Sequence, residues 1–201
     1  MSKKRYFSHS TILKLTLSAI FLAIGIVLPF FTGQIQHIGN LLLPMHLPVF
    51  LCGLICGWKY GFLVGFLLPL LRSFMFGMPF FFPNAIAMSV ELAVYGLVSG
   101  LIYGVLKHRN ILSIYVAMLP AMLLGRMAWG IMQIILLGIQ HNKFTWQMFI
   151  AGAFLNAVPG IILQLVLIPT IISVLHLSGI IRFNENIEDK IRKGSDKYGT
   201  I

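Results

Sequence analysis

Long apolar segments separated by short polar links constrain this chain more than any other feature of its sequence. The chain has 201 residues, of which 58% are hydrophobic and only 10% are charged, and its mean hydropathy is +0.91. Soluble globular domains carry roughly 25% charged residues, so the bilayer is the solvent that this composition fits. We therefore predict an all-α, polytopic membrane protein without a separate soluble domain.

Six segments are apolar enough to cross the membrane, for which a helix needs about 20 mainly apolar residues. They cover approximately residues 12–31, 41–57, 62–77, 84–106, 111–139 and 148–175. The second segment is short, and the fifth is long enough to tilt. The sequence thus divides into an N-terminal segment (1–11), a bundle of six transmembrane helices (12–175) and a basic tail (176–201).

Lysine and arginine are distributed unevenly over the two sides of these segments. With the N-terminus inside, 12 of the 15 basic residues lie on the cytoplasmic side, and the opposite loops hold one, Lys143. Cytoplasmic loops carry the excess of basic residues in membrane proteins. The pattern predicts two cytoplasmic termini and outward-facing loops at 32–40, 78–83 and 140–147. It also accounts for the net charge of +10 without a nucleic-acid partner.

Three formal charges lie inside the apolar segments: Arg72, Glu91 and Arg126. Charge at membrane depth costs a few kcal/mol per residue on insertion scales, so it usually faces a partner, a cavity or a ligand. Arg72 is near the outer end of its segment, from which its side chain can also extend to the interface. Glu91 and Arg126 can neutralise each other as a structural pair or contribute to a binding site, and both alternatives stay open.

Other polar and aromatic residues share helix faces with these charges, because residues three, four or seven apart lie on one side of a helix. Counted from the outer ends at 1.5 Å per residue, Glu91, Gln133 and Asn156 lie roughly 9 to 12 Å deep and Arg126 roughly 20 Å deep. Such convergence predicts a small-molecule pocket with apolar walls and a few oriented polar groups. The candidate residues are Asn84, Glu91, Tyr95, Arg126, Trp129, Gln133 and Asn156, with Arg72 as a further candidate; Gln164 shares a face with Asn156. A pocket arginine favours an anionic group on the ligand.

The sequence lacks the motifs of several catalytic, nucleotide-binding and metal-binding chemistries. Cys52 and Cys56 are interpreted as buried packing residues, and His46, between two prolines, as a residue that begins a helix. The sequence has no P-loop and no H-E-x-x-H, and its single membrane-depth acid forms no carboxylate dyad. We predict no catalytic residue, no cofactor and no metal site. An intramembrane enzyme and a membrane scaffold protein are the alternative functions.

Several stretches resemble the S components of energy-coupling factor (ECF) transporters, which are substrate-binding membrane subunits. The first segment carries an Ala-x-x-x-Ala pair, Ala19 and Ala23. Residues 41–57 (LLLPMHLPVFLCGLICG) resemble the second-helix region of that superfamily. Residues 69–73 (PLLRS) and 82–100 (FPNAIAMSVELAVYGLVSG) resemble its vitamin-type branches, near the pantothenate-like and folate-like ones. The resemblance covers residues 12–175.

The resemblance implies a subunit in a prokaryotic plasma membrane that captures a vitamin or related micronutrient from outside, such as an anionic, pantothenate-like one. It implies delivery by tilting within the bilayer, driven by a separate transmembrane coupling subunit and two ATPase subunits. Ala19 and Ala23 would be the docking surface for the coupling subunit, whereas packing inside the bundle is the other interpretation of such small residues. The identity of the vitamin, and whether the energising module is dedicated or shared, stay open.

Overall fold

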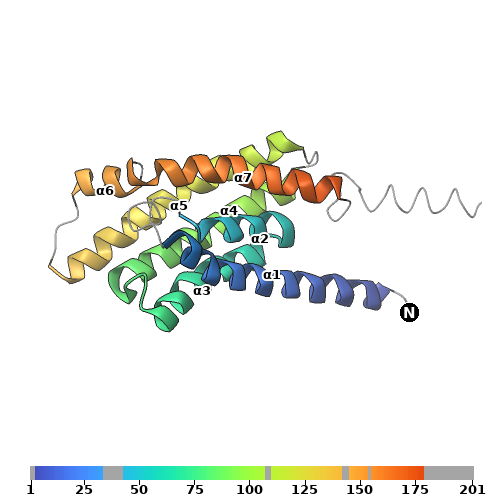
Figure 1. The fold of residues 1–201 in the computed structure, drawn as a ribbon, viewed down its shortest axis with the longest axis horizontal. Coiled ribbons are helices and arrows are strands. Elements are labelled where there is room, and N and C mark those ends of the chain that lie inside the picture. The colour runs from blue at the N-terminus through green and yellow to red at the C-terminus, as the bar shows by residue number, and fades with distance from the viewer. Residues whose placement is uncertain (1–2, 34–42, 107–109, 142–144, 154, 179–201) are drawn as a thin grey trace, which may run out of the picture.

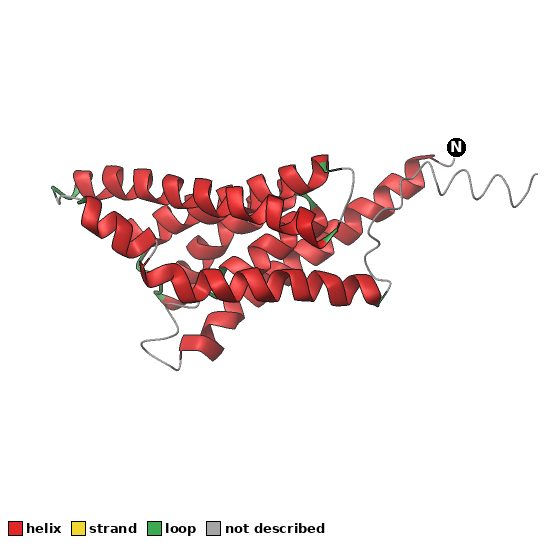
Figure 2. Ribbon diagram, turned by 90° about the horizontal axis from the view of Figure 1, so that it is seen from above, coloured by secondary structure: helices red, strands yellow, loops and turns green. Residues whose placement is uncertain are grey.

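The long helices run roughly along the long axis of the computed structural model (Figure 1). The structure describes residues 3–33, 43–106, 110–141, 145–153 and 155–178. Within these ranges Figure 2 shows only helices and loops. Most of the predicted loop at 32–40 and of the tail at 176–201 lies outside the described residues.

The described helices confirm a polytopic helical membrane protein. They are α1 (Lys3–Gly33), α2 (His46–Cys56), α3 (Trp58–Phe76), α4 (Ile86–Val105), α5 (Ile111–Ile139), α6 (Trp146–Ala153) and α7 (Val158–Leu177), with a π-helical turn at Phe81–Ala85 and a 3-10 turn at Leu155–Ala157. Five stretches are long and apolar enough to cross a membrane: Thr11–Phe31, Trp58–Phe76, Phe81–Val105, Ile111–Ile139 and Trp146–Leu177. The eleven-residue α2 corresponds to the second predicted segment and is too short to be counted among these five.

Two of the expected segment boundaries differ in the structure. The second helix begins at His46, and the third begins at Trp58, so the turn expected over 57–61 is reduced to Gly57. The φ angle of Gly57 is +98°, which a residue without a Cβ adopts at little cost. The sixth segment is interrupted between α6 and α7, and Pro159 falls in the first turn of α7, where a proline is tolerated.

The central helix α4 packs against α2, α3 and α5. Glycines bring the backbones of α2, α3 and α4 together: a Cβ on Gly61 would lie 2.6 Å from the carbonyl oxygen of Gly96, and one on Gly53 would lie 2.7 Å from the same atom. In lipid, contacts of this closeness depend on small residues. Five glycines of these helices therefore pack inside the bundle: Gly53, Gly61, Gly65, Gly96 and Gly100.

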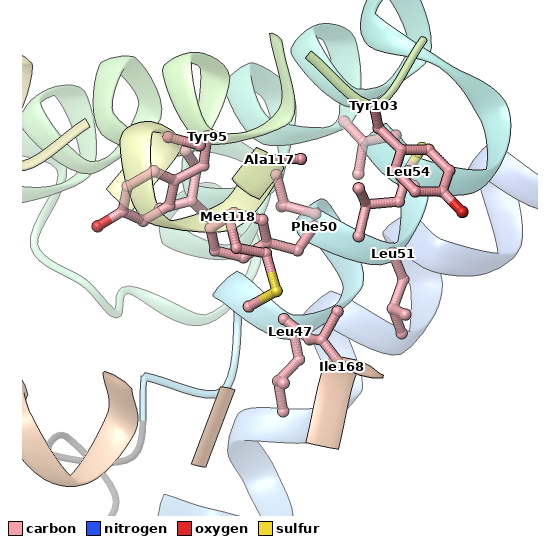
Figure 3. Close-up of a cluster of buried hydrophobic side chains, with 14 of the residues drawn as sticks. Leu47, Phe50, Leu51, Leu54, Tyr95, Tyr103, Ala117, Met118 and Ile168 are labelled. Atoms are coloured by element: carbon pink, nitrogen blue, oxygen red, sulfur yellow. The ribbon is translucent and has the colours of Figure 1, made fainter. Parts of the chain in front are cut away.

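A cluster of buried apolar side chains from α2, α4, α5 and α7 forms the core (Figure 3). The rings of Phe50 and Tyr95 stack with their centroids 5.0 Å apart, and Met118 and Ile168 are fully buried beside them. Nearly every residue of α2 is buried, including the free thiol of Cys52. This core encloses α2 on all sides and fixes the position of its first residue, His46.

Candidate functional site

A charge cluster lies buried where the first turn of α2 meets α4 and α5. The Nη1 atom of Arg126 donates a hydrogen bond to Glu91 Oε1 over 2.9 Å, and His46 Nε2 lies 3.5 Å from the same oxygen. The exposed fractions of His46, Glu91 and Arg126 are 1%, 2% and 5%. One carboxylate thus serves two basic side chains in apolar surroundings.

Local sequence explains how each of these side chains reaches the cluster. His46 begins α2 after a turn in which its backbone N–H donates to the carbonyl of Leu43 over 3.1 Å. Glu91 lies in the second turn of α4 and faces α5. Arg126 follows Gly125, at which any Cβ would overlap the ring of Tyr95. The glycine therefore lets α5 approach α4 closely enough for the ion pair to form.

Tyr95 supports the cluster one helical turn after Glu91. Its ring stacks on Phe50, and its centroid lies 5.2 Å from that of His46 at an interplanar angle of 57°. The Tyr95 hydroxyl also interacts with the carboxylate of Glu91. Tyr95 thus contacts both the imidazole of His46 and the carboxylate of Glu91.

Arg126 uses only part of its hydrogen-bonding capacity within the described residues. Its Nε and Nη2 atoms are buried and have no partner there, and the same holds for Nε2 of Gln164 on α7. A buried donor without an acceptor costs about 1–3 kcal/mol. All three atoms carry hydrogen, so a group that satisfies them has to accept. A carboxylate or another oxygen-rich group fits Arg126 best, because the guanidinium edge binds it through two parallel hydrogen bonds.

A second polar contact lies two helical turns beyond Arg126 on the same face of α5. The Nε2 atom of the buried Gln133 donates to Oδ1 of Asn84 over 3.5 Å, which connects α5 to the turn that precedes α4. Asn84 itself is exposed. Polar groups therefore continue beyond Arg126 along this face of α5.

Trp129 belongs to an aromatic row between α5 and α6. Its ring centroid lies 6.4 Å from that of Phe149, which lies 5.3 Å from that of Trp146. Gly130 and Gly152 make room for these rings, since a Cβ at either position would overlap one of them. The row holds α6 to α5 beside the charge cluster.

Two further predicted site residues form no hydrogen bond or ion pair in the described structure with either the charge cluster or the Asn84–Gln133 pair. Asn156 is exposed in the 3-10 turn between α6 and α7. Arg72 donates from Nη1 to the carbonyl oxygen of Ile26 on α1 over 2.6 Å, and its guanidinium lies 4.9 Å from the ring centroid of Phe30 and 6.0 Å from that of Phe76. The structure therefore brings together Glu91, Tyr95 and Arg126, and separately pairs Asn84 with Gln133.

His46 is the cluster residue that sequence reasoning missed. It does begin a helix, as interpreted, but it also contacts Glu91. The available signal was its polar character within a segment that is otherwise apolar from residue 41 to residue 57. A polar side chain that is fully buried needs a partner, and the partner of His46 was already among the candidates.

The Ala-x-x-x-Ala pair lies on the outside of the bundle. The helix α1 packs on α2 and α3 with one face, to which Ser18 and Gly25 belong. Ala19 and Ala23 are exposed on another face. A shallow apolar groove there is lined by Ala23, Ile24, Val27, Leu28 and Phe31. Internal packing thus does not account for the two alanines within the described chain.

Comparison with known families supplies the last finding. The family model described as "ECF transporter, substrate-specific component" matches residues 13–172. Comparisons with curated proteins and with solved structures gave no significant match. The matched range includes the buried charge cluster, both alanines and all but the ends of the helical bundle. This chain therefore belongs to the family of substrate-specific components of ECF transporters, and it is a substrate-binding subunit of such a transporter.

Proposed function

We propose that this subunit captures an anionic vitamin or a related carboxylate micronutrient from outside the cell, and that Arg126 binds the anionic group. The observation that carries the proposal is the incomplete hydrogen bonding of the Arg126 guanidinium. Its Nη1 is held by Glu91, whereas Nε and Nη2 are buried without an acceptor among the described residues. Guanidinium groups recognise carboxylates in a bidentate manner, so this free edge matches such a ligand in both charge and geometry.

The neighbouring residues receive roles that follow from their positions. Glu91 orients Arg126, and Tyr95 fixes Glu91 from the apolar side. Gln133 and Asn84 contribute polar groups farther along the same face, and Trp129 contributes an aromatic wall. Apolar walls with a few oriented polar groups are typical of small-molecule sites. Arg72 and Asn156 are left out of this proposal because neither forms a hydrogen bond or ion pair with the cluster in the described structure.

The partners follow from the family and from the surface of α1. A substrate-specific component of this family works with a transmembrane coupling subunit and ATPase subunits. We propose that the coupling subunit docks on the exposed face of α1 around Ala19 and Ala23, in the plasma membrane of a prokaryote. Small residues let a partner helix approach closely in lipid, and the apolar groove beside Ala23 widens the contact.

Mass spectrometry of small molecules that co-purify with the protein in mild detergent tests the ligand class, and a carboxylate is expected. The identified compound should raise the melting temperature, because a ligand that binds only the folded state stabilises it. A neutral or cationic compound as the only ligand contradicts the proposal.

Substitution of Arg126 tests the assignment of the site. Truncating one partner of a buried, hydrogen-bonded charge pair costs about 2–5 kcal/mol of binding free energy, and each 1.4 kcal/mol is about tenfold in affinity. We therefore expect Arg126→Ala to weaken binding by at least about 30-fold. Because the unpaired Glu91 can also destabilise the fold, the double variant Arg126→Ala/Glu91→Gln serves as the electrically neutral control. Normal binding by a folded double variant shows that the anion binds elsewhere.

A further inference from the structure

Glu91 has two basic neighbours, of which it needs only one to be charged. We propose that a carboxylate substrate binds together with one proton, which His46 takes up when Arg126 turns its free edge to the substrate. The inference rests on the proposed function, since it assumes an anion at Arg126. It concerns a residue to which the substrate site has so far assigned no role.

The charges of the cluster lead to this proposal. Without ligand, the positive Arg126 and the negative Glu91 balance each other, and His46 completes a neutral group of three when it is uncharged. A bound carboxylate adds one negative charge to a site in which every member is at most 5% exposed. Uncompensated charge is unfavourable in such surroundings, and one proton restores neutrality.

The geometry of His46 fits this use. Its Nε2 atom already points at Glu91 Oε1 across 3.5 Å, so protonation converts the contact into an ion pair without a rearrangement. The other ring nitrogen, Nδ1, is buried and has no hydrogen-bond partner among the described residues, so a proton bound there would give the imidazolium its second N–H group. The backbone carbonyl of Leu43 is a nearby acceptor for the imidazolium. Histidine is also the side chain whose charge ordinarily changes between about pH 5 and 8.

Other ionisable groups around α2 do not compete for this role. From α4 the imidazole faces Glu91 and Tyr95, and from α5 it faces Arg126. On α2 itself, Cys52 donates toward Ser18 on α1 over 3.7 Å. Cys56 lies in the last turn of α2, and Lys59 and Tyr60 lie in the first turn of α3. Lys14 lies one turn before Ser18, Arg72 is bound to Ile26, and His176 lies in the last turn of α7. None of these has a hydrogen bond or ion pair with His46 in the described structure.

Glu91 is the rival site for the proton. Protonation of Glu91 would also restore neutrality, but it would weaken the hydrogen bond that holds Nη1 of Arg126. Protonation of His46 keeps Glu91 ionised and Arg126 fixed, so that the guanidinium can use its other edge for the ligand. The two cases differ in what substitution of His46 does to proton uptake.

Calorimetric titration of the full chain in detergent measures this uptake directly. Pantothenate, biotin and folate are the probes, and each is titrated in two buffers with different heats of ionisation between about pH 6 and 8. For the probe that binds wild-type protein, we expect up to one proton taken up per ligand and an affinity that increases by up to about tenfold per unit decrease in pH. His46→Gln should abolish both the uptake and the pH dependence. Cys52→Ala, which lies on α2 outside the cluster, should leave both unchanged.

Each result decides a different question. Tight binding by the wild type without proton uptake overturns the inference and leaves the proposed function intact. Undiminished uptake by His46→Gln places the proton on another group and also overturns the inference. If His46→Gln does not fold, His46→Asn replaces it, and the wild-type uptake remains decisive. Failure of all three carboxylates to bind the wild type overturns the proposed function together with the inference.

Discussion

Arg72 and Arg126 show how differently two arginines within apolar segments are used. Arg126 points inward to Glu91 and has donors without a partner among the described residues. Arg72 instead donates a hydrogen bond to the backbone of α1 and lies against two phenylalanine rings. Pro29 lies three residues after the carbonyl that Arg72 binds. A proline interrupts the helical hydrogen-bond ladder, so a side-chain donor nearby helps to stabilise this turn. Arg72 therefore acts as a clamp, in the sense that its side chain on α3 binds α1 through a hydrogen bond and a ring contact.

Replacing Arg72 by methionine tests the clamp. The variant loses a hydrogen bond from a charged donor and two ring contacts, and we expect a destabilisation of about 2 kcal/mol. A thermal melt of the ligand-free protein measures this loss. Lys59→Met, which removes an exposed lysine 5.5 Å from the ring of Trp58, is the matched control and should change stability little. A large loss of substrate affinity without a loss of stability would instead return Arg72 to the substrate site.

At this scale the sequence left the pairing of Glu91 with Arg126 as one of two alternatives, because opposite charges inside lipid-facing segments have few other partners. The depth count was wrong for this pair, since it placed Arg126 deeper than Glu91, whereas the two side chains are in contact. The sequence did not predict the contact of His46. Spacing along one helix identifies residues that share a face, but a contact between helices depends on how far one helix is shifted along another. That shift is set by the backbone approach of α2 and α4 at glycines, which only the folded bundle specifies.

Among the five candidate membrane spans, the one in α1 is the least buried within the bundle. Only 11% of its membrane window is buried, against 56% for the segment that contains α4. One face of α1 packs on α2 and α3, and the opposite side presents large apolar residues together with Ala19 and Ala23. The small residues on this exposed side are what a docking helix needs.

Bulky substitutions on this face separate docking from folding. We expect Ala19→Trp and Ala23→Trp to reduce uptake by at least about tenfold, because close helix contact requires small side chains. Ligand affinity and expression should stay within about twofold of the wild type, since both alanines are exposed. Uptake by whole cells and binding by purified protein are compared.

Two control variants distinguish a loss of docking from a loss of folding. Val166→Trp changes an exposed residue of α7 and should leave uptake intact. Gly25→Leu changes the buried face of α1, where a Cβ would lie 2.6 Å from a methyl group of Leu68, and should reduce expression and binding together. If the alanine variants behave like Gly25→Leu, α1 packs internally at these positions and the docking proposal fails.

The helix boundaries show which features a hydropathy pattern can predict. The fifth helix covers Ile111–Ile139, as predicted, because Asn110 caps its start and polar residues follow its end. The sixth segment was predicted as one helix and is interrupted at Leu155–Ala157, since the apolar run continues through the break. The third helix starts at Trp58, four residues before the predicted boundary. The hydropathy pattern missed this first turn because the turn is amphipathic and not apolar. Composition thus locates spans, whereas breaks inside them depend on backbone geometry.

For the whole molecule, the distribution of basic residues assigns each end of the bundle to one side of the membrane. Lys59 and Ser178 belong to the predicted cytoplasmic end, and Gln140 belongs to the opposite end; all three are exposed. Basic residues are retained on the cytoplasmic side of membrane proteins, so we expect charge, and not packing, to specify the orientation.

Labelling of intact cells with an impermeant thiol reagent tests this orientation. On a background without Cys52 and Cys56, a cysteine at Gln140 should react, and cysteines at Lys59 and Ser178 should react only after permeabilisation. Reaction at Lys59 in intact cells would require the inverted topology and would place the charge cluster nearer the cytoplasm.

The pairing of Glu91 with Arg126 also has a consequence for how the chain enters the membrane during synthesis. The two residues lie on consecutive helices, so α4 leaves the ribosome before the partner of its carboxylate exists. A charged residue at the centre of an isolated helix opposes insertion by about 3 kcal/mol. We therefore expect α4 and α5 to enter the lipid most favourably as a hairpin, with the ion pair already formed. The charges that define the candidate site then favour insertion of these two helices together.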